Sequence, residues 1–290
     1  MDAYFTHLLI LIGIYSILAV SLQMTLGYSG LLNLGHIAFF GIGAYVYAIL
    51  SLGGEPSSFL CLMMAGAFSA FFGYLLSVST NKLKGDYLAL VSLGFSFMVY
   101  AVLLNWNDLT RGPLGLPGIP RPIIAGIDFS NNTAFLFLVF FIALISYFFI
   151  HHICNSPFGK VLEAARDDEL AAKSLGKNTS RIKSLSLLIS AFFAGIAGAL
   201  FASYITFIDP SSFTFMNLMP ILLIVIIGGL ASLPGTILAT ILIILLPEPL
   251  RFIGFPSSIL GPMRQIIYAV ILLLIIYYKP RGFFGKIDLE

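Results

Sequence analysis

The sequence contains few charged residues: Asp, Glu, Lys and Arg make up 10% of its 290 positions, whereas hydrophobic residues make up 59%. Soluble domains carry about 25% charged residues, so this composition excludes a soluble protein with a polar surface. A bilayer-spanning helix needs about 20 apolar residues, and the chain has room for about eight to ten of them. We therefore predict an all-α, polytopic integral membrane protein that forms a single transmembrane domain over residues 1–290.

The sequence also lacks the motifs that common enzymes use. None of its Gly-Lys pairs has the upstream glycine and the following Ser or Thr that a phosphate-binding loop requires. A Gly-x-Ser-x-Gly nucleophile elbow is absent, and no group of His, Cys, Asp and Glu residues has the spacing of a metal site. We therefore expect a non-catalytic chain that binds no cofactor or metal itself.

Other absences narrow the function further. The net charge is only +2 and no basic run is interleaved with aromatic residues, so nucleic acid is not an expected partner. The two cysteines, Cys61 and Cys154, are expected to lie too far apart to form a disulfide. Carboxylates within spans usually mark proton or ion relays, yet Asp86, Asp209 and Glu248 fall at the ends of apolar segments. An ion-driven carrier lacks its usual residues here, so energy for transport would come from another subunit.

Nine apolar segments are candidate spans. They cover residues 7–26, 31–52, 57–77, 87–106, 133–151, 184–207, 216–230, 236–252 and 263–278. The second segment is rich in glycine around Asn33 and His36, so we expect a broken or re-entrant span. If it does not cross, the number of spans is eight. Prolines and glycines in residues 107–132 exclude a regular helix there and predict a folded external lip.

Lys and Arg residues collect in three regions and predict the orientation, because positively charged loops stay in the cytoplasm. The regions are a short loop with Lys82 and Lys84, the segment 155–183, and a C-terminal tail with Lys286. An even number of apolar segments separates each region from the next, so all three can share one side. We therefore expect a cytoplasmic C-terminus and an external N-terminus.

Residues 155–183 form a hydrophilic segment between two spans and hold ten of the 28 charged residues. Ser156 followed by Pro157 is typical of a helix N-terminus, and the acidic residues around Asp168 suit the start of a second helix. Gly176 suits the left-handed residue that ends this helix. We predict two short helices in water that form a docking surface. An ordinary positively charged cytoplasmic loop is the alternative.

Several blocks of sequence, in order along nearly the whole chain, resemble one family of transport proteins. Residues 163–176, EAARDDELAAKSLG, are similar to the EAA loop of ABC importer permeases. Six further blocks resemble the permeases of the branched-chain amino acid ABC importers. They are GYSGLLNLGHIAFFGIGAY at 27–45, LKGDYLALVSLGF at 83–95, GPLGLPGIP at 112–120, ISAFFAGIAGALFA at 189–202, IIGGLASLPGT at 226–236 and KPRGFFG at 279–285. The block at 83–95 resembles the M-type subunit more than its H-type partner. Asp209 and Thr236 depart from the usual pattern.

The resemblance implies a multi-pass permease subunit in the bacterial cytoplasmic (inner) membrane that translocates branched-chain amino acids. Its implied partners are the lipid bilayer, a second, H-type permease, two ATP-binding subunits that use ATP and Mg²⁺, and an extracytoplasmic substrate-binding protein. The segment 155–183 would be the coupling loop that contacts the ATP-binding subunits. The coupling residues would be Glu163, Ala164, Ala165, Arg166, Asp167, Asp168, Glu169, Leu170 and Gly176.

Polar residues within the predicted spans are candidates for the translocation pathway, because such side chains usually face the bundle interior. They are Ser29, Asn33, His36, Ser92 and Ser96. Asn33 and His36 could instead satisfy backbone groups freed beside Gly30 and Gly35. The competing functions are an ABC permease for urea, short amides or other amino acids, an ATP-independent carrier or channel, and a purely structural subunit.

Overall fold

The computed structural model describes residues 2–54, 57–80, 85–124, 126–248, 257–279 and 281–285, and nearly all of its regular structure is helical. Five helices in this part are long and apolar enough to cross a membrane. They are α1 (Asp2–Gln23) with its continuation to Tyr28, α3 (Ser58–Thr80), α4 (Gly85–Asn105), α6 (Asn132–Asn155) and α9 (Thr179–Ile205). The predicted all-α, polytopic membrane fold is therefore confirmed.

Four further apolar helices complete the set. They are α2 (His36–Leu52), α10 (Met219–Gly228), α11 (Leu233–Leu245) and α13 (Ser257–Tyr278). Each of the nine predicted apolar segments coincides with one of these nine apolar helices of the described ranges, and the end of the 236–252 segment lies outside the described residues. The Ser232 hydroxyl accepts a hydrogen bond from Gly235 N and caps α11, which explains why this helix starts before its predicted position.

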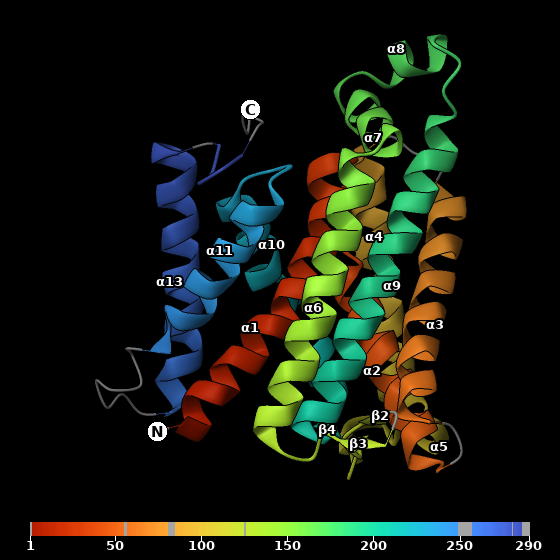
Figure 1. The fold of residues 1–290 in the computed structure, drawn as a ribbon. Helices are drawn as coiled ribbons and strands as arrows, with labels where there is room; N and C mark the ends of the chain where they lie inside the picture. Colours follow the sequence, from red (N-terminus) through yellow and green to blue (C-terminus); the bar gives the residue numbers. More distant parts are fainter. Residues whose placement is uncertain are drawn as a thin grey trace.

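The second span is broken, as the glycine-rich sequence predicts. Helix α1 continues as a π-helical turn, η1 (Met24–Tyr28), residues 29–35 have no helical structure, and α2 begins at His36. Figure 1 shows that α2 then continues to the end of the bundle where α3 begins. The chain therefore crosses here, but only the second part of the crossing is a helix.

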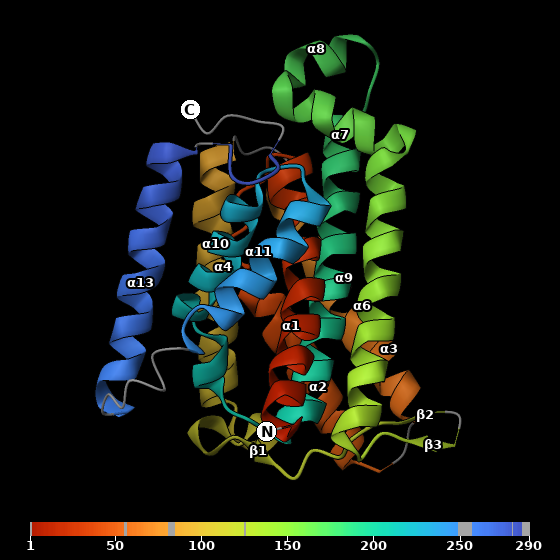
Figure 2. The ribbon, with the colours of Figure 1, turned by 60° about the vertical axis from the view of Figure 1, so that its left-hand side comes forward.

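Helix α9 lies at the centre of one group of helices and packs against both α2 and α3 (Figure 1). Helix α1 lies beside it and also contacts α6, α10 and α11 (Figure 2). A Cβ atom built on Gly43 of α2 would lie 2.2 Å from the carbonyl oxygen of Gly195 in α9. Small residues thus allow the two backbones to touch, as is common where helices pack within a membrane.

The predicted external lip is folded. Its elements are α5 (Asn107–Thr110), η2 (Gly112–Leu114), β1 (Leu116–Pro117), β2 (Ile123–Ile124) and β3 (Ile127–Asp128), together with β4 (Phe207–Ile208), η3 (Pro210–Phe213) and η4 (Phe215–Leu218) after α9. Strand β1 pairs with β4 and β2 pairs with β3, both antiparallel. The Arg121 guanidinium lies 5.6 Å from the ring centre of Phe135 and 5.7 Å from that of Tyr204. These contacts hold the lip against the helix ends.

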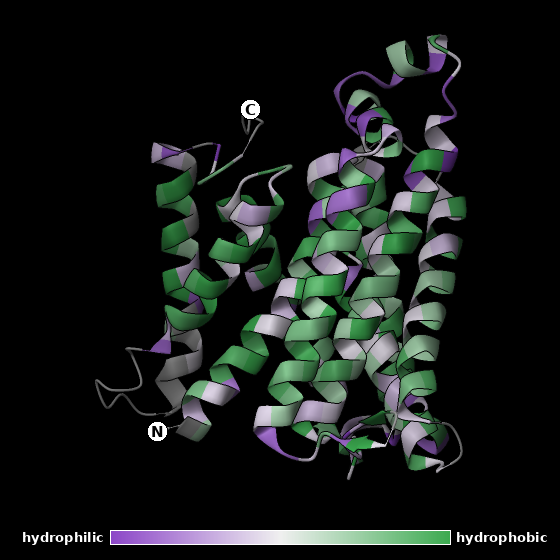
Figure 3. Cartoon of the chain, in the orientation of Figure 1, coloured by the Kyte–Doolittle hydropathy of each residue, from purple (hydrophilic) through white to green (hydrophobic). Residues whose placement is uncertain are grey.

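Polar residues collect at the two ends of the bundle, above all on α7 (Pro157–Asp167) and α8 (Glu169–Ser174), which project beyond the spans (Figure 3). Helix α1 starts at the opposite end, whereas α13 finishes at the end that carries α7 and α8 (Figure 1). Asp209 lies in the turn before η3 and Glu248 follows α11, which agrees with their predicted places at segment ends. Lys82, Lys84 and Lys286 lie outside the described residues.

Candidate functional site: the coupling segment and the buried polar residues

The hydrophilic segment 155–183 contains the two short helices that its sequence predicts. The Ser156 hydroxyl accepts a hydrogen bond from Phe158 N (3.2 Å) and caps α7, with Pro157 as the first helical residue. Asp168 Oδ1 accepts hydrogen bonds from Leu170 N (2.9 Å) and Ala171 N (3.0 Å) and caps α8. Gly176 has a φ of 77°, the left-handed conformation expected after a helix. Local side chains therefore determine where α7 and α8 begin and where α8 ends.

The predicted coupling residues differ in how far they reach solvent. Ala165 is buried; Glu163, Arg166 and Glu169 are half-buried; and Ala164, Asp167, Asp168, Leu170 and Gly176 are exposed. Leu170 of α8 is 78% exposed and Leu175, the residue that follows α8, is 79% exposed, so two large apolar side chains face water here. Exposed apolar side chains on a polar projection favour a protein-binding surface.

Three charged residues of the motif have contacts within the chain. Asp168 is the N-cap of α8, Arg166 Nη1 donates to Gly27 O (2.7 Å), and Glu169 binds Lys173 and Lys183. Of the predicted charged set, Asp167 is exposed and contacts only the neighbouring Arg166 among the described residues. These residues therefore shape the segment, whatever they contact outside the chain.

Glu169 joins α8 to the start of α9. Its carboxylate lies 2.8 Å from Lys173 Nζ and 2.7 Å from Lys183 Nζ, and accepts a hydrogen bond from the Thr179 hydroxyl (3.0 Å). Partial burial raises the pKa of this carboxyl, but the hydrogen bonds from Lys173, Lys183 and Thr179 lower it more, to about 2. The ionised form is thus the one that the fold stabilises.

Acid is expected to loosen α8 only well below neutral pH. The pKa of Glu169 falls from 4.5 to about 2 on folding, so its stabilisation is complete above about pH 4.5 and is lost as the pH falls towards about 2. Because the side chain is 38% exposed, solvent screening limits the contribution to about 1 kcal/mol.

Amide hydrogen exchange of residues 169–174, corrected for intrinsic rates, measures this effect. Protection should stay constant from pH 8 to about pH 5, and Glu169→Gln should lower it at pH 7. Equal protection in the two proteins at pH 7 would contradict the prediction.

The predicted pathway residues are all buried, and α1, α2 and α9 share a polar seam. Ser29, Asn33, His36, Ser92 and Ser96 are each at most 3% exposed. His36 Nε2 lies 3.0 Å from Ser21 Oγ and 3.1 Å from Leu18 O, and Ser190 Oγ of α9 donates to Ser21 O (2.6 Å). His36 therefore contacts the C-terminal part of α1 rather than an open channel within this chain.

Asn33 and Ser92 satisfy backbone groups of the broken span. Asn33 Oδ1 accepts a hydrogen bond from Gly35 N (3.0 Å), and Ser92 Oγ of α4 accepts one from Leu34 N (3.0 Å). This is the structural role that the sequence offered as the alternative to solute contact. In the part of the chain that the structure describes, Asn33 Nδ2 and His36 Nδ1 are buried without a hydrogen-bond partner, so both side chains keep unused donor or acceptor capacity.

Gln23 is a buried polar residue that the sequence reasoning did not single out. Its Nε2 donates to Gly229 O (2.7 Å) in the turn between α10 and α11, and the side chain is fully buried. An amide at the end of a long apolar run was the available signal, because polar groups inside spans are costly unless they bind a partner.

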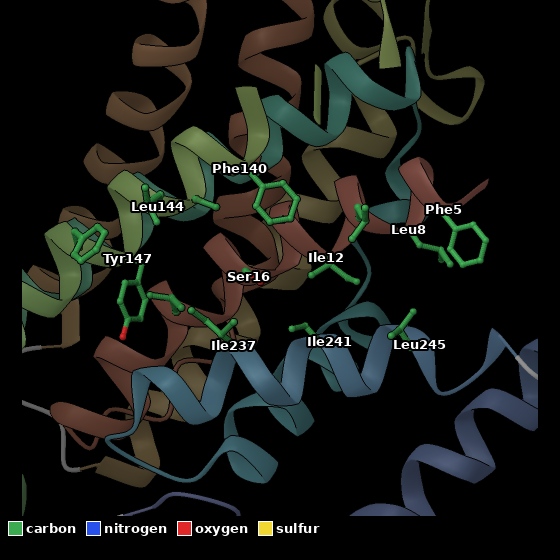
Figure 4. A pocket seen from close by; sticks show the side chains of 15 residues that line it. Phe5, Leu8, Ile12, Ser16, Phe140, Leu144, Tyr147, Ile237, Ile241 and Leu245 are labelled. Carbon is green, nitrogen blue, oxygen red and sulfur yellow. The ribbon is translucent and has the colours of Figure 1, made fainter. Parts of the chain in front are cut away.

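A groove of about 680 Å³ lies between α1, α6 and α11. Its lining is almost entirely apolar, with Phe5, Leu8, Ile12 and Ser16 from α1 facing Phe140 and Leu144 of α6 and Ile237, Ile241 and Leu245 of α11 (Figure 4). A zwitterionic amino acid would lose its hydration there without gaining polar partners. The groove therefore suits apolar chains rather than a transported amino acid.

A second cavity, of about 580 Å³, lies between α10 and α13. Leucine and methionine side chains line it together with Asn217, Gln265 and Tyr268. This mixture of aliphatic and amide groups suits a small amphipathic solute better than the apolar lining of the first groove does.

Comparison with known proteins identifies the family. The family described as branched-chain amino acid transport system / permease component matches residues 4–276. The high-affinity branched-chain amino acid transport system permease protein LivM of Escherichia coli is 37% identical over 93% of this chain and 67% of its own length. The probable LivM of Methanocaldococcus jannaschii is 26% identical, over 95% of this chain and 91% of its own length. No solved structure matches.

The comparison also separates the two permease types. The high-affinity branched-chain amino acid transport system permease protein LivH of Escherichia coli is 25% identical over 95% of this chain and 92% of its own length, lower than the 37% for LivM. The M-type resemblance of residues 83–95 agrees with this difference. The chain therefore belongs to the branched-chain amino acid transport system permease family, as a member of its M-type subunits.

Proposed function

We propose that this chain is the M-type membrane subunit of an ATP-driven importer that passes branched-chain amino acids into the cell. The observation that carries the proposal is the projecting α7–α8 segment, with its locally capped helices and its exposed Leu170 and Leu175. Such a segment suits a groove on a cytoplasmic partner, and the EAA-like residues 163–176 lie on it. The chain forms one permease domain, and residues 155–183 are its coupling loop.

In this proposal the subunit is not an enzyme. Two separate ATP-binding subunits hydrolyse ATP with Mg²⁺, and they move the spans by pulling on α7 and α8. The orientation is an external N-terminus and a cytoplasmic C-terminus in the bacterial inner membrane. Support comes from Lys160, Lys173, Lys177 and Arg181, which all lie in the segment 155–183, because positively charged loops stay in the cytoplasm.

The proposed assembly has two further partners. An H-type permease would cover apolar surface on α4 and α13, where Leu90 is 65% exposed and Leu273 is 69% exposed. An external substrate-binding protein would dock on the lip formed by residues 107–132. Solute would pass between the two permeases, close to the broken span with Ser29, Asn33 and His36 and to Ser92 and Ser96 of α4.

Reconstitution tests the function directly. Proteoliposomes should contain this chain together with an H-type permease, two ATP-binding subunits and a substrate-binding protein of the same transport system. ATP trapped inside the vesicles should drive uptake of radiolabelled leucine, isoleucine and valine in preference to urea, acetamide or polar amino acids. Preferential uptake of urea or an amide would replace the proposed solute.

Two control preparations separate the competing functions. Vesicles with this chain alone should show no uptake under a sodium or proton gradient, and uptake there would indicate a carrier or channel. In the full complex, the double variant Asn33→Ala and His36→Ala should impair uptake. Unchanged uptake by this variant would remove both residues from the pathway.

A further inference from the structure

Polar contacts join the coupling segment to helix α1 and to the turn between α10 and α11, neither of which is its neighbour in sequence. Residues 155–178 continue directly into α6 and α9, so the covalent chain carries any displacement of the segment to those helices. Helix α1 and the α10–α11 turn have no such connection. The contacts of Arg166 and Gln23 provide one.

Arg166 holds the end of α1. Its Nη1 donates to Gly27 O (2.7 Å), within the π-helical turn that ends α1, and its other donors bind Asp167 Oδ1 (2.8 Å). Carbonyl groups at a helix C-terminus lack partners inside the helix, and a guanidinium forms stronger hydrogen bonds than a neutral donor. The side chain is only 17% exposed, so solvent screens this contact little.

The arginine stem also lies against the broken span. Gly30 has a φ of 66°, and a Cβ atom there would lie 2.6 Å from Arg166 Cγ. The start of the irregular residues 29–35 is thus shaped around this side chain. A shift of α7 must move Arg166 relative to both Gly27 and Gly30 or carry them with it.

Gln23 continues the contact to the α10–α11 turn. A Cβ atom on Gly27 would lie 2.6 Å from Ala231 N and 3.0 Å from Gln23 Cδ, so these three groups touch. Gln23 Nε2 binds Gly229 O (2.7 Å). The turn is held in its place by residues 281–285, because Phe283 N donates to Ile227 O (2.8 Å). One unbroken set of contacts therefore leads from α7 through the end of α1 to the α10–α11 turn.

We propose that Arg166 is a positioning residue that transmits displacement of the coupling segment to α1, and that Gln23 passes it on to the α10–α11 turn. This inference rests on the proposed function. It assigns Arg166 an internal role in place of the contact with an ATP-binding subunit that its position in the EAA-like motif implies. Spatial contact alone does not demonstrate coupling, so the test measures energy transfer.

The experiment compares variants of the full complex in proteoliposomes, with two readouts: leucine imported per ATP hydrolysed, and copurification of the ATP-binding subunits. Arg166→Gln should lower the import ratio about tenfold, as expected for loss of a charge-assisted hydrogen bond, while copurification and stimulated ATP hydrolysis persist. Arg166→Lys keeps a cationic donor and should recover part of the ratio. Arg181→Gln removes an exposed arginine of the same segment and should leave it unchanged.

Gln23→Leu tests the second step. It should lower the ratio, and the double variant Arg166→Gln with Gln23→Leu should be no worse than Arg166→Gln alone, because residues that act in series are not additive. Additive losses would overturn the role of Gln23. An unchanged ratio in Arg166→Gln, or loss of ATP-binding subunits from this variant alone, would overturn the role of Arg166.

If the Arg166→Gln permease itself does not fold, Arg166→Lys and Gly30→Ala are compared with wild type instead. Arg166→Lys should stay close to the wild-type import ratio, whereas Gly30→Ala, which displaces the arginine stem, should lower it. Equal ratios in all three proteins would overturn the inference. Failure of the wild-type complex to import leucine would instead contradict the proposed function.

Discussion

Substitution of Gly198 by alanine is expected to destabilise the folded protein by about 3 kcal/mol, at the upper end of the usual cost of overpacking. A Cβ atom at this position would lie 2.0 Å from the carbonyl oxygen of Phe40 and 2.9 Å from Ala44 N. Both neighbours are backbone atoms of α2, so no side chain can rotate to make room. The helices must separate, which disturbs contacts along the whole α2–α9 interface.

Thermal unfolding of the purified chain in detergent measures this effect, and Gly94→Ala is the matched control. Gly94 lies in a transmembrane helix too, but a Cβ atom there would meet nothing within 4 Å. Since alanine is a better helix former than glycine, Gly94→Ala should stabilise the protein by about 0.5 to 1 kcal/mol. If both variants unfold at the wild-type temperature, the close approach of α2 and α9 does not exist in solution.

The double variant Leu170→Asp and Leu175→Asp is expected to abolish binding of the ATP-binding subunits. Both side chains, one on α8 and one at its C-cap, are more than three-quarters exposed, so the change should not disturb the fold of the permease. In the complex each aspartate would be buried without a partner, which costs about 2 kcal/mol or more per site. The two costs together correspond to roughly a thousandfold weaker binding. Copurification and leucine uptake should both be lost.

Leu114→Asp provides a control at the opposite end of the helix bundle. Leu114 is 79% exposed, as Leu175 is, but lies in η2 of the lip. This variant should retain its ATP-binding subunits. Retention of these subunits by the α8 variant would show that α8 is not the docking surface, and their loss from Leu114→Asp would place the docking surface at the lip.

The helices and the hydrophilic segment 155–183 could be predicted because their signals are local. Long apolar runs indicated α1, α3, α4, α6 and α9. In the segment 155–183, the residues Ser156, Pro157 and Gly176 determine where its helices begin and end through bonds to their own neighbours. Glycine and Asn33 in the second span likewise indicated a break, and the break lies at residues 29–35.

The features that could not be predicted depend on contacts between distant residues. The π-helical turn at Met24–Tyr28 has no sequence pattern of its own, and its partner Arg166 is far away along the chain. Strands β1 and β4 contain two residues each, too few for a periodic pattern. For Arg166, the motif indicated a surface residue, whereas the fold turns its guanidinium towards Gly27.

The two cysteines make this chain a convenient background for chemical labelling. Cys61 lies near the start of α3 and Cys154 near the end of α6; within the described residues neither forms a disulfide, and both are buried. A maleimide that cannot cross membranes therefore has little access to either native thiol in the folded protein. A single cysteine introduced at Leu114 or Leu170 would react from one side of the bilayer only, so the sidedness of each end can be read without first removing the native thiols.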